Sequence, residues 1–280
     1  MNKSVCELLA QAVAIEEEAA KDAGALGFMA RSMVQATMPH KKQASNEYIR
    51  KNGSFTMTMF APSDIGLPFG TIPRLLLAWI STEAVRTQER TLILGDTLSG
   101  FMRDLEMVPT GGRWGTITRL RDQMERLFSC FVSCSYSGAG RWAIKNVSIA
   151  SEVNLWWEPK EPNQAALWQS TLKLSEDFYR EIIAHPIPID LRALKALRKS
   201  PLALDLYFWL TYRMSYLNES TVIPWRLLAD QFGAGYSRED DFKRYLCEAF
   251  KKVVTVYPAV KVEIEKGGLK IKPSPTHVLR

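Results

Sequence analysis

The stretch Val260-Lys-Val-Glu-Ile-Glu-Lys-Gly-Gly-Leu-Lys-Ile271 is the clearest local signal in the chain. Apolar residues alternate with charged ones on both sides of Gly267-Gly268, which is typical of two paired strands with one buried and one solvated face. The turn between the two strands is expected at Lys266-Gly267-Gly268. The stretch therefore predicts a β-hairpin.

Working outward from this hairpin, two helices are expected immediately before it. Ser237 is followed three residues later by Asp240, a cap-like pattern that begins the second helix. Pro224 opens the first helix, which ends at Phe232 before Gly233-Ala234-Gly235. A short strand at 221–223 and a long apolar helix from about Leu202 to Leu217 come earlier. Helix, strand, two helices and a two-stranded wing form the order of a winged helix-turn-helix module.

The first half of the chain repeats this order. An apolar helical run begins near Leu75 and leads to a short strand at 91–94. A helix from Thr97 to about Met107, with Asp96 as its expected cap, is followed by a helix from about 114 to 130. A hairpin over 131–149 then turns at Gly138-Ala139-Gly140. Tandem repetition predicts an α+β fold with two winged-helix domains.

We expect four segments along the chain. Residues 1–60 are predicted to form an N-terminal helical arm, with a polar and flexible boundary after Pro39, and residues 61–160 the first winged-helix domain. Residues 161–186 form a connector, and residues 187–280 the second winged-helix domain. Trp156-Trp157 and Trp168 are expected to pack between the domains.

Two helices are candidates for insertion into a DNA major groove. The first places Ile117, Leu120, Met124 and Leu127 on a buried stripe, with Arg119 and Arg126 opposite. The second buries Phe242, Leu246, Ala249 and Val253, with Arg244 and Lys251 opposite. The residues expected to contact DNA, from both helices and both hairpins, are Arg113, Thr116, Arg119, Arg126, Arg141, Lys145, Arg238, Lys243, Arg244, Lys251, Lys266, Lys270 and Lys272.

Each of these groups also has an ordinary structural interpretation. A charged helix stripe can simply be a solvated face, and lysines on an edge strand can serve only to prevent aggregation. The arrangement occurs twice, each time after a glycine turn and before a hairpin. This repetition favours DNA binding.

Composition sets wider limits. The 280 residues carry a formal net charge of +6, with a sequence pI near 9.1, which is compatible with phosphate binding. Hydrophobic residues make up 46%, as expected of a globular chain. No apolar run is long enough to span a bilayer and no secretory signal is visible, so we expect a cytoplasmic protein without a membrane partner.

The sequence argues against an enzyme. The histidines His40, His185 and His277 form no pair at metal-ligand spacing, and no phosphate-binding glycine loop is present. Cys130 and Cys134 are four residues apart, but no second pair stands near them, so packing within a strand competes with a zinc site. We expect no catalytic residues, metal or cofactor.

Several motifs resemble the plasmid-encoded RepA-type replication initiators. They include Gly66-Leu-Pro-Phe-Gly70, Pro73-Arg-Leu-Leu-Leu-Ala-Trp79, Thr82-Glu-Ala-Val-Arg-Thr87, Leu94-Gly95, Thr110-Gly-Gly112, Pro201-Leu-Ala-Leu-Asp-Leu-Tyr-Phe-Trp-Leu-Thr-Tyr-Arg213 and Trp225-Arg-Leu-Leu-Ala-Asp-Gln-Phe-Gly233. The resemblance covers roughly residues 60–275. It implies two winged-helix domains that bind repeated double-stranded DNA sites at a plasmid origin and recruit host replication proteins such as an initiator and a helicase.

The resemblance also implies that dimers of such proteins can repress their own promoter, so a homodimer is among the expected partners. Composition and periodicity alone indicate only DNA-binding architecture. A winged-helix transcriptional regulator without an initiation role therefore stays open as the alternative.

Overall fold

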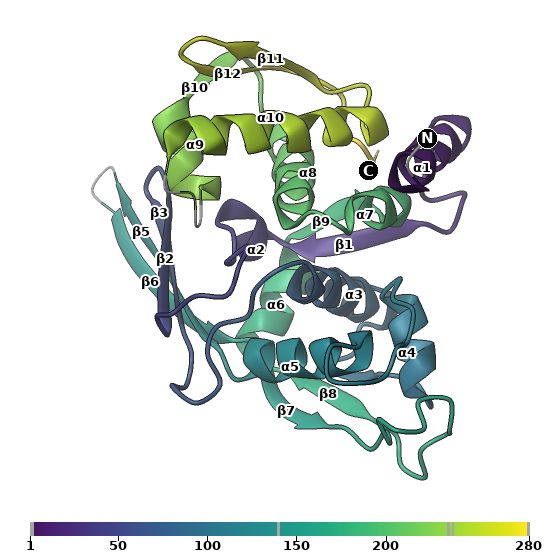
Figure 1. Cartoon of the computed structure of the whole chain (residues 1–280). Helices are drawn as coiled ribbons and strands as arrows, with labels where there is room; N and C mark the ends of the chain where they lie inside the picture. The colour runs from purple at the N-terminus through teal and green to yellow at the C-terminus, as the bar shows by residue number, and fades with distance from the viewer. Residues whose placement is uncertain (1–2, 139–140, 234–235, 237, 279–280) are drawn as a thin grey trace.

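The computed structural model describes residues 3–138, 141–233, 236 and 238–278, with the side chains of Lys3, Arg141 and Trp142 also outside the described part. It is a mixed α+β structure in which two groups of elements share one connectivity (Figure 1). The group in the C-terminal half consists of α8 (Pro201–Met214), β10 (Thr221–Pro224), α9 (Trp225–Phe232), α10 (Glu239–Val256), β11 (Lys261–Glu265) and β12 (Gly268–Lys272). Its three strands form an antiparallel sheet in the order β10-β12-β11.

The C-terminal hairpin follows the predicted alternation. Leu269 and Ile271 are fully buried, and Val260 is buried just before β11. Ile264 stays 53% exposed near the turn, so the apolar face is covered only away from the tip. Gly268 lies against β10, where an added Cβ would stand 2.1 Å from the carbonyl oxygen of Ile223. This position therefore requires glycine.

The group in the N-terminal half has the same order but uses a different strand pair from the one expected. It consists of α3 (Ile72–Thr87), β4 (Thr91–Ile93), α4 (Leu98–Asp104), α5 (Thr116–Phe128), β7 (Ala150–Asn154) and β8 (Thr171–Leu174). The sheet order is β4-β8-β7, which matches β10-β12-β11 strand for strand. The loop at 155–170 therefore occupies the place of the C-terminal hairpin turn.

The predicted hairpin at 131–149 does form, as β5 (Phe131–Gly138) and β6 (Arg141–Ser148), but it does not pair with β4. The expectation that it is the first wing is wrong. It joins β2 (Glu47–Asn52) and β3 (Phe55–Phe60) in a four-stranded antiparallel sheet, in the order β2-β3-β5-β6. The turn residues Ala139 and Gly140 lie outside the described part.

Residues 1–60 are not a purely helical arm. They contain α1 (Lys3–Glu17) and the short α2 (Arg31–Gln35), but also β1 (Leu26–Ala30), β2 and β3. The expected flexible segment contains Asn52-Gly53, a strong hairpin turn signal, and Gly53 has a φ of 58°. Buried Met57 and Met59 alternate with Thr56 and Thr58, which places one face of β3 inward.

The predicted connector is also structured. Ser175 caps α6 (Glu176–Ala184), because its hydroxyl accepts from the amide of Phe178. β9 (Pro186–Asp190) follows and pairs with β1, and α7 (Leu191–Leu197) packs against α1. The cap of α4 is Thr97, whose hydroxyl accepts from Gly100, and not Asp96.

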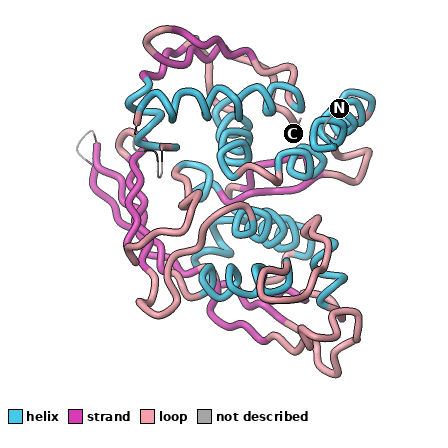
Figure 2. The backbone as a smooth tube through the Cα atoms, in the orientation of Figure 1, coloured by secondary structure: helices cyan, strands magenta, loops and turns pink. Residues whose placement is uncertain are grey.

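The tryptophans of the 155–170 loop do not pack between the two halves, contrary to expectation. Trp157 lies within the N-terminal half, where its ring stacks on Phe101 at 5.2 Å and its Nε1 donates to the carbonyl of Gly95. Trp156 and Trp168 are 55% and 68% exposed. Figure 2 shows the 155–170 loop extending away from the body of the chain.

The contact between the halves is made instead by α3, α8 and the N-terminal segment. Arg74 of α3 is 1% exposed, and Asp205 of α8 is 5% exposed. Arg74 Nε and Nη2 donate to the two carboxylate oxygens of Asp205, each at 2.7 Å. The same guanidinium donates to the carbonyls of Met38, Pro39 and Gly70. A buried charge with all its donors satisfied therefore joins the halves.

His40 completes this cluster. Its Nε2 lies 2.7 Å from Asp205 Oδ2, and burial lowers the pKa of the imidazole. Burial alone would raise the pKa of Asp205, but Arg74 and His40 together hold it below its usual value. Thr37 adds a buried bond to the carbonyl of Gln231, so the 37–40 segment is tied to both halves.

Candidate nucleic-acid interface

The start of α5 is held by a compact turn. Thr116 Oγ1 donates to the carbonyl of Val108 at 2.6 Å and accepts from the amide of Thr110. An added Cβ at Gly115 would stand 2.2 Å from the carbonyl oxygen of Thr110, so this residue must be glycine. Thr116 therefore shapes the turn, and its hydroxyl is already engaged by the protein.

This turn presents Arg113 and Trp114 to solvent. Trp114 is 80% exposed, and the Arg113 guanidinium lies 5.1 Å from its ring centroid, in a cation–π contact. A cation and a flat ring beside the first turn of α5 suit contact with a phosphate and its sugar. Sequence reasoning selected Arg113 but missed Trp114. Its position beside two glycines in a polar loop was the available signal.

The buried stripe of α5 is as predicted, with Ile117, Leu120, Met124 and Leu127 all inside. Arg119 is exposed, and Arg121, which sequence reasoning missed, is also exposed on α5. No carboxylate of the described residues forms an ion pair with Arg113, Arg119 or Arg121. These three cations are free to contact an anion.

Arg126 does not belong to this exposed surface. Its side chain is 13% exposed and its Nε lies 3.0 Å from Asp122, while its guanidinium lies over the ring of Phe69. The loop at 61–71 covers this side of α5, since the amide of Phe69 also donates to Gln123. Arg126 anchors that loop, so its proposed role in DNA contact is wrong for this arrangement.

Among the described side chains of the β5–β6 hairpin, none is a free cation of the expected kind. Lys145 points to α6, where its Nζ donates to the carbonyl of Asp177 and lies 4.0 Å from Glu181. The side chain of Arg141 lies outside the described part. Lys145 is therefore a structural contact within the N-terminal half.

α10 differs from α5 in the charges near its start. Its buried stripe is as predicted, but Glu239, Asp240 and Asp241 occupy the first turn. Lys243 pairs with Glu239 at 2.8 Å, and Arg244 pairs with Asp241 at 3.1 Å. Acidic side chains stabilise the N-terminus of a helix, but their negative charge repels phosphate groups. The N-terminal end of α10 is therefore less suited to DNA than that of α5.

Other cations of the C-terminal half remain open to solvent. Arg238 and Lys251 are exposed, and neither forms an ion pair within the described residues. Arg244 also lies 4.9 Å from the ring of Tyr245, which is 43% exposed. Unpaired cations thus lie at the N-cap of α10, at Arg238, and in its C-terminal part, at Lys251.

The lysines of the C-terminal hairpin are largely paired across the strands. Lys270 lies 3.4 Å from Glu265, and Lys272 pairs with Glu263 and lowers the pKa of that carboxyl. Lys266, at the turn, is exposed and forms no ion pair within the described part. Among the described lysines of the hairpin, Lys261 and Lys266 are thus the two whose charges are not offset by an ion pair.

The cysteines give no support to a metal site. Cys130 is buried and Cys134 lies on the inner face of β5, and burial raises the pKa of each thiol to about 12. Protonated thiols are poor metal ligands. Among the residues with described positions, no group of three His, Cys, Asp or Glu side chains could hold a metal ion.

Within the same described residues, none of the helices has the length and apolar character needed to span a membrane.

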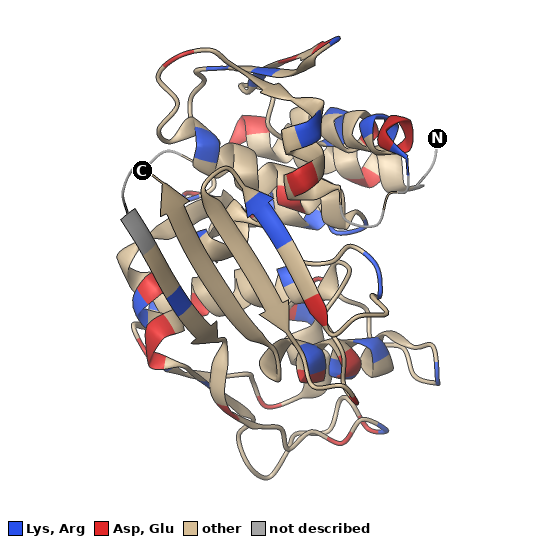
Figure 3. Cartoon of the chain, turned by 90° about the vertical axis from the view of Figure 1, so that its left-hand side faces the viewer, with Lys and Arg blue, Asp and Glu red and all other residues tan. Residues whose placement is uncertain are grey.

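The outer face of the four-stranded sheet is a second exposed surface. Phe60 and Phe131 lie opposite each other in the β3–β5 register and are 44% and 62% exposed. Ile49 and Ile144 lie on the same face and are about half exposed. The two middle strands carry no charged residue, and Figure 3 shows them as an uncharged band facing the viewer.

Comparison with known proteins gives a family and a fold. The family model described as plasmid-encoded RepA protein matches residues 67–226, more than half of the chain. A crystal structure of domains 2 and 3 of RctB is 11% identical, with a TM-score of 0.54, and the match covers 87% of this chain and 96% of that one. A second structure of RctB domains 2-3 is 12% identical, with a TM-score of 0.52 and coverage of 86% and 96%. No curated protein matches the chain.

Proposed function

Because the chain belongs to the family of plasmid-encoded RepA proteins, we propose that it initiates plasmid replication by binding double-stranded DNA through two winged helix-turn-helix modules. The observation that carries this proposal is the duplicated order of helix, strand, two helices and two strands, with matching sheet orders β4-β8-β7 and β10-β12-β11. α5 and α10 are the recognition helices of the two modules. The chain performs no catalytic chemistry of its own in this role.

The first wing in this proposal is the 155–170 loop between β7 and β8. Its exposed Trp156, Leu167 and Trp168 lie where the C-terminal module has its hairpin turn with Lys266. Apolar and aromatic side chains on a wing suit the floor or walls of a minor groove, whereas Lys266 suits a phosphate. The two wings thus differ in chemistry.

We propose that a second copy of this chain covers the outer face of the four-stranded sheet. The face combines exposed Phe60, Phe131 and Ile144 with uncharged Ser and Thr side chains. The β3 and β5 part of this face has no charge to attract DNA, but a matching copy would bury these rings. Dimers and monomers would then differ in how they engage repeated origin sites, and host replication proteins are further partners.

The direct test is DNA affinity after removal of the free arginines on α5. Replacing Arg119 and Arg121 with Gln should lower affinity for origin DNA by about tenfold or more, because phosphate and base-edge contacts are lost. The matched control replaces Arg86 and Arg180, two exposed arginines of the same half that pair with Glu83 and Glu176. Equal gel-shift affinities for both double variants would contradict the assignment of α5.

A transcriptional regulator remains the second candidate, because the same architecture would serve a repressor. Genetic context separates the two functions. Directly repeated sites beside an A/T-rich region support initiation, and loss of plasmid replication in the Arg119→Gln, Arg121→Gln variant would confirm it. A lone palindrome at a promoter, with replication unaffected, would support the regulator instead.

A further inference from the structure

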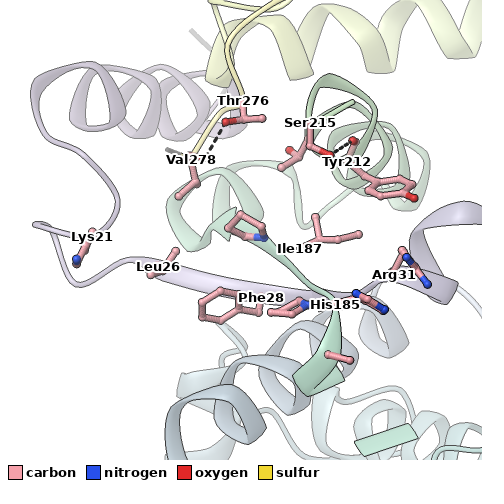
Figure 4. A pocket seen from close by; sticks show the side chains of 14 residues that line it. Lys21, Leu26, Phe28, Arg31, His185, Ile187, Tyr212, Ser215, Thr276 and Val278 are labelled. Carbon is pink, nitrogen blue, oxygen red and sulfur yellow. Dashed lines mark hydrogen bonds between the residues drawn. The ribbon is translucent and has the colours of Figure 1, made fainter. Parts of the chain in front are cut away.

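A cavity of about 560 Å³ lies away from α5 and α10, where three parts of the chain meet (Figure 4). Strands β1 and β9 form one side through Leu26, Phe28 and Ile187. The C-terminal end of α8 and the segment near Val278 form the rest. This volume is within the usual range for small-molecule sites, which often lie where separate parts of a structure meet.

The charged residues that line this cavity are all cationic. Lys21 and Arg31 contribute these charges, His185 adds an imidazole, and no Asp or Glu lines the cavity. Within the described residues, neither Arg31 nor Lys21 forms an ion pair with any carboxylate. In Figure 4, Arg31 and His185 lie toward one end and Lys21 toward the other. Cations without partners favour an anionic ligand, and Arg can bind a phosphate or carboxylate with two parallel hydrogen bonds.

The hydroxyl groups in the lining leave little donor capacity for other ligands. Thr211 donates to the carbonyl of Tyr207, Ser215 to that of Tyr212, and Thr276 to that of Val278. Their hydrogens are therefore already used. The remaining side-chain donors are Lys21 at one end of the cavity, Arg31 and His185 toward the other, and the phenol of Tyr212. Arg31 and His185 can therefore bind a phosphate at their end.

The middle of the cavity is apolar and includes a ring. Phe28 and Ile187 lie between the two charged ends in Figure 4, and Leu26 continues the same surface along β1. A flat ring can stack on Phe28 and bury its apolar area there. An anion alone would leave this surface in contact with water, so the ligand should carry both a ring and an anionic group.

We propose that this cavity binds a nucleoside monophosphate, with the phosphate at Arg31 and His185 and the base on Phe28 and Ile187. Such a ligand would contact β1, β9 and α8 together, and would hold the N-terminal segment against the C-terminal half. The proposal does not depend on DNA binding, and its test uses no DNA.

The experiment is calorimetric titration of the full chain with AMP, adenosine and inorganic phosphate. AMP should bind, and adenosine and phosphate should each bind at least tenfold more weakly, because each lacks one of the two recognised parts. The other three ribonucleoside monophosphates test the preference for the base. Absence of binding by all four monophosphates at millimolar concentration would overturn the proposal.

Variants locate the binding. Arg31→Gln should weaken AMP binding at least tenfold, and Phe28→Leu should weaken AMP more than phosphate, since it removes the ring but keeps an apolar side chain. The matched controls are Arg86→Gln on α3 and Arg119→Gln on α5, exposed arginines outside the cavity. AMP binding that is unchanged in Arg31→Gln and Phe28→Leu, or lost in Arg119→Gln, would place the ligand elsewhere and contradict the proposal.

Discussion

At the scale of single residues, the Arg74–Asp205 pair is the most constrained interaction in the molecule. Both side chains are almost fully buried, and the guanidinium has no donor to spare. Such a pair adds little net stability compared with an apolar replacement, but removing one partner leaves a buried charge without compensation. Its main effect is therefore to fix how α3 and α8 meet.

The change Asp205→Asn should lower the free energy of unfolding by about 3–5 kcal/mol, because Arg74 would lose its counter-charge while still buried. Urea denaturation at neutral pH measures the loss. Glu83→Gln, which breaks the exposed pair with Arg86, serves as the control and should cost less than about 1 kcal/mol. Equal effects of the two changes would contradict the role of the buried pair.

Buried histidines make stability depend on pH. Burial lowers the pKa of His277 to about 4, from 6.5 in the unfolded chain, and the pKa of His40 is also lowered. The unfolded state therefore binds more protons between these values, so stability is fully present above pH 6.5 and falls as the pH drops toward 4. His277 alone should account for about 2 kcal/mol of loss at pH 5.

The measurement is the urea midpoint at pH 7.5 and pH 5 for the native chain and for His277→Phe. The variant should lose less stability between the two pH values, because it has no imidazole to protonate on unfolding. A His277→Phe chain with the native pH dependence would show that other groups are responsible.

At the scale of elements, individual helices, hairpins and caps could be predicted from the sequence, but the pairing of distant strands could not. The buried stripes of α5 and α10, the C-terminal hairpin and the Ser175 cap all follow from residues close in sequence. The pairing of β4 with β8 joins residues about 80 apart, and no local pattern encodes it. For this reason the 131–149 hairpin was assigned to the wrong sheet.

The candidate site was limited in the same way. Arg126 lies on the predicted stripe, but the distant 61–71 loop covers it. In the C-terminal hairpin, the pairing of lysines with glutamates could have been predicted from the local sequence, but it was missed. Glu263 stands directly opposite Lys270 in the strand register. Alternating acidic and basic residues on facing strands predict cross-strand pairs that reduce the charge available to DNA.

The outer face of the four-stranded sheet gives a prediction at this scale. Phe131→Ser should shift the chain from dimer toward monomer, because the exposed ring would no longer be buried by a second copy. Sedimentation velocity over a range of concentrations measures the change. Ile93→Ser on β4, a comparably exposed apolar side chain elsewhere, should leave the oligomeric state unchanged. A native chain that stays monomeric at all concentrations would contradict this interface.

At the scale of the whole molecule, the two groups of elements are not connected by a flexible linker. The connector forms β8 and α6 and leads directly into β9, and α1 packs against α7 and α10. The cluster of Arg74, Asp205 and His40 joins the halves from within. The spacing of the two proposed recognition helices, α5 and α10, should therefore be set before DNA arrives, which favours one fixed separation between half-sites.

Hydroxyl-radical footprinting of the full chain on plasmid origin DNA tests the central claim most directly. Two modules with a fixed separation should protect two successive major grooves on roughly one face of the duplex, about 10 base pairs apart from centre to centre. Inserting five base pairs between the half-sites should abolish one of the two protected regions. A single protected groove, with affinity unaffected by the insertion, would contradict the two-module account.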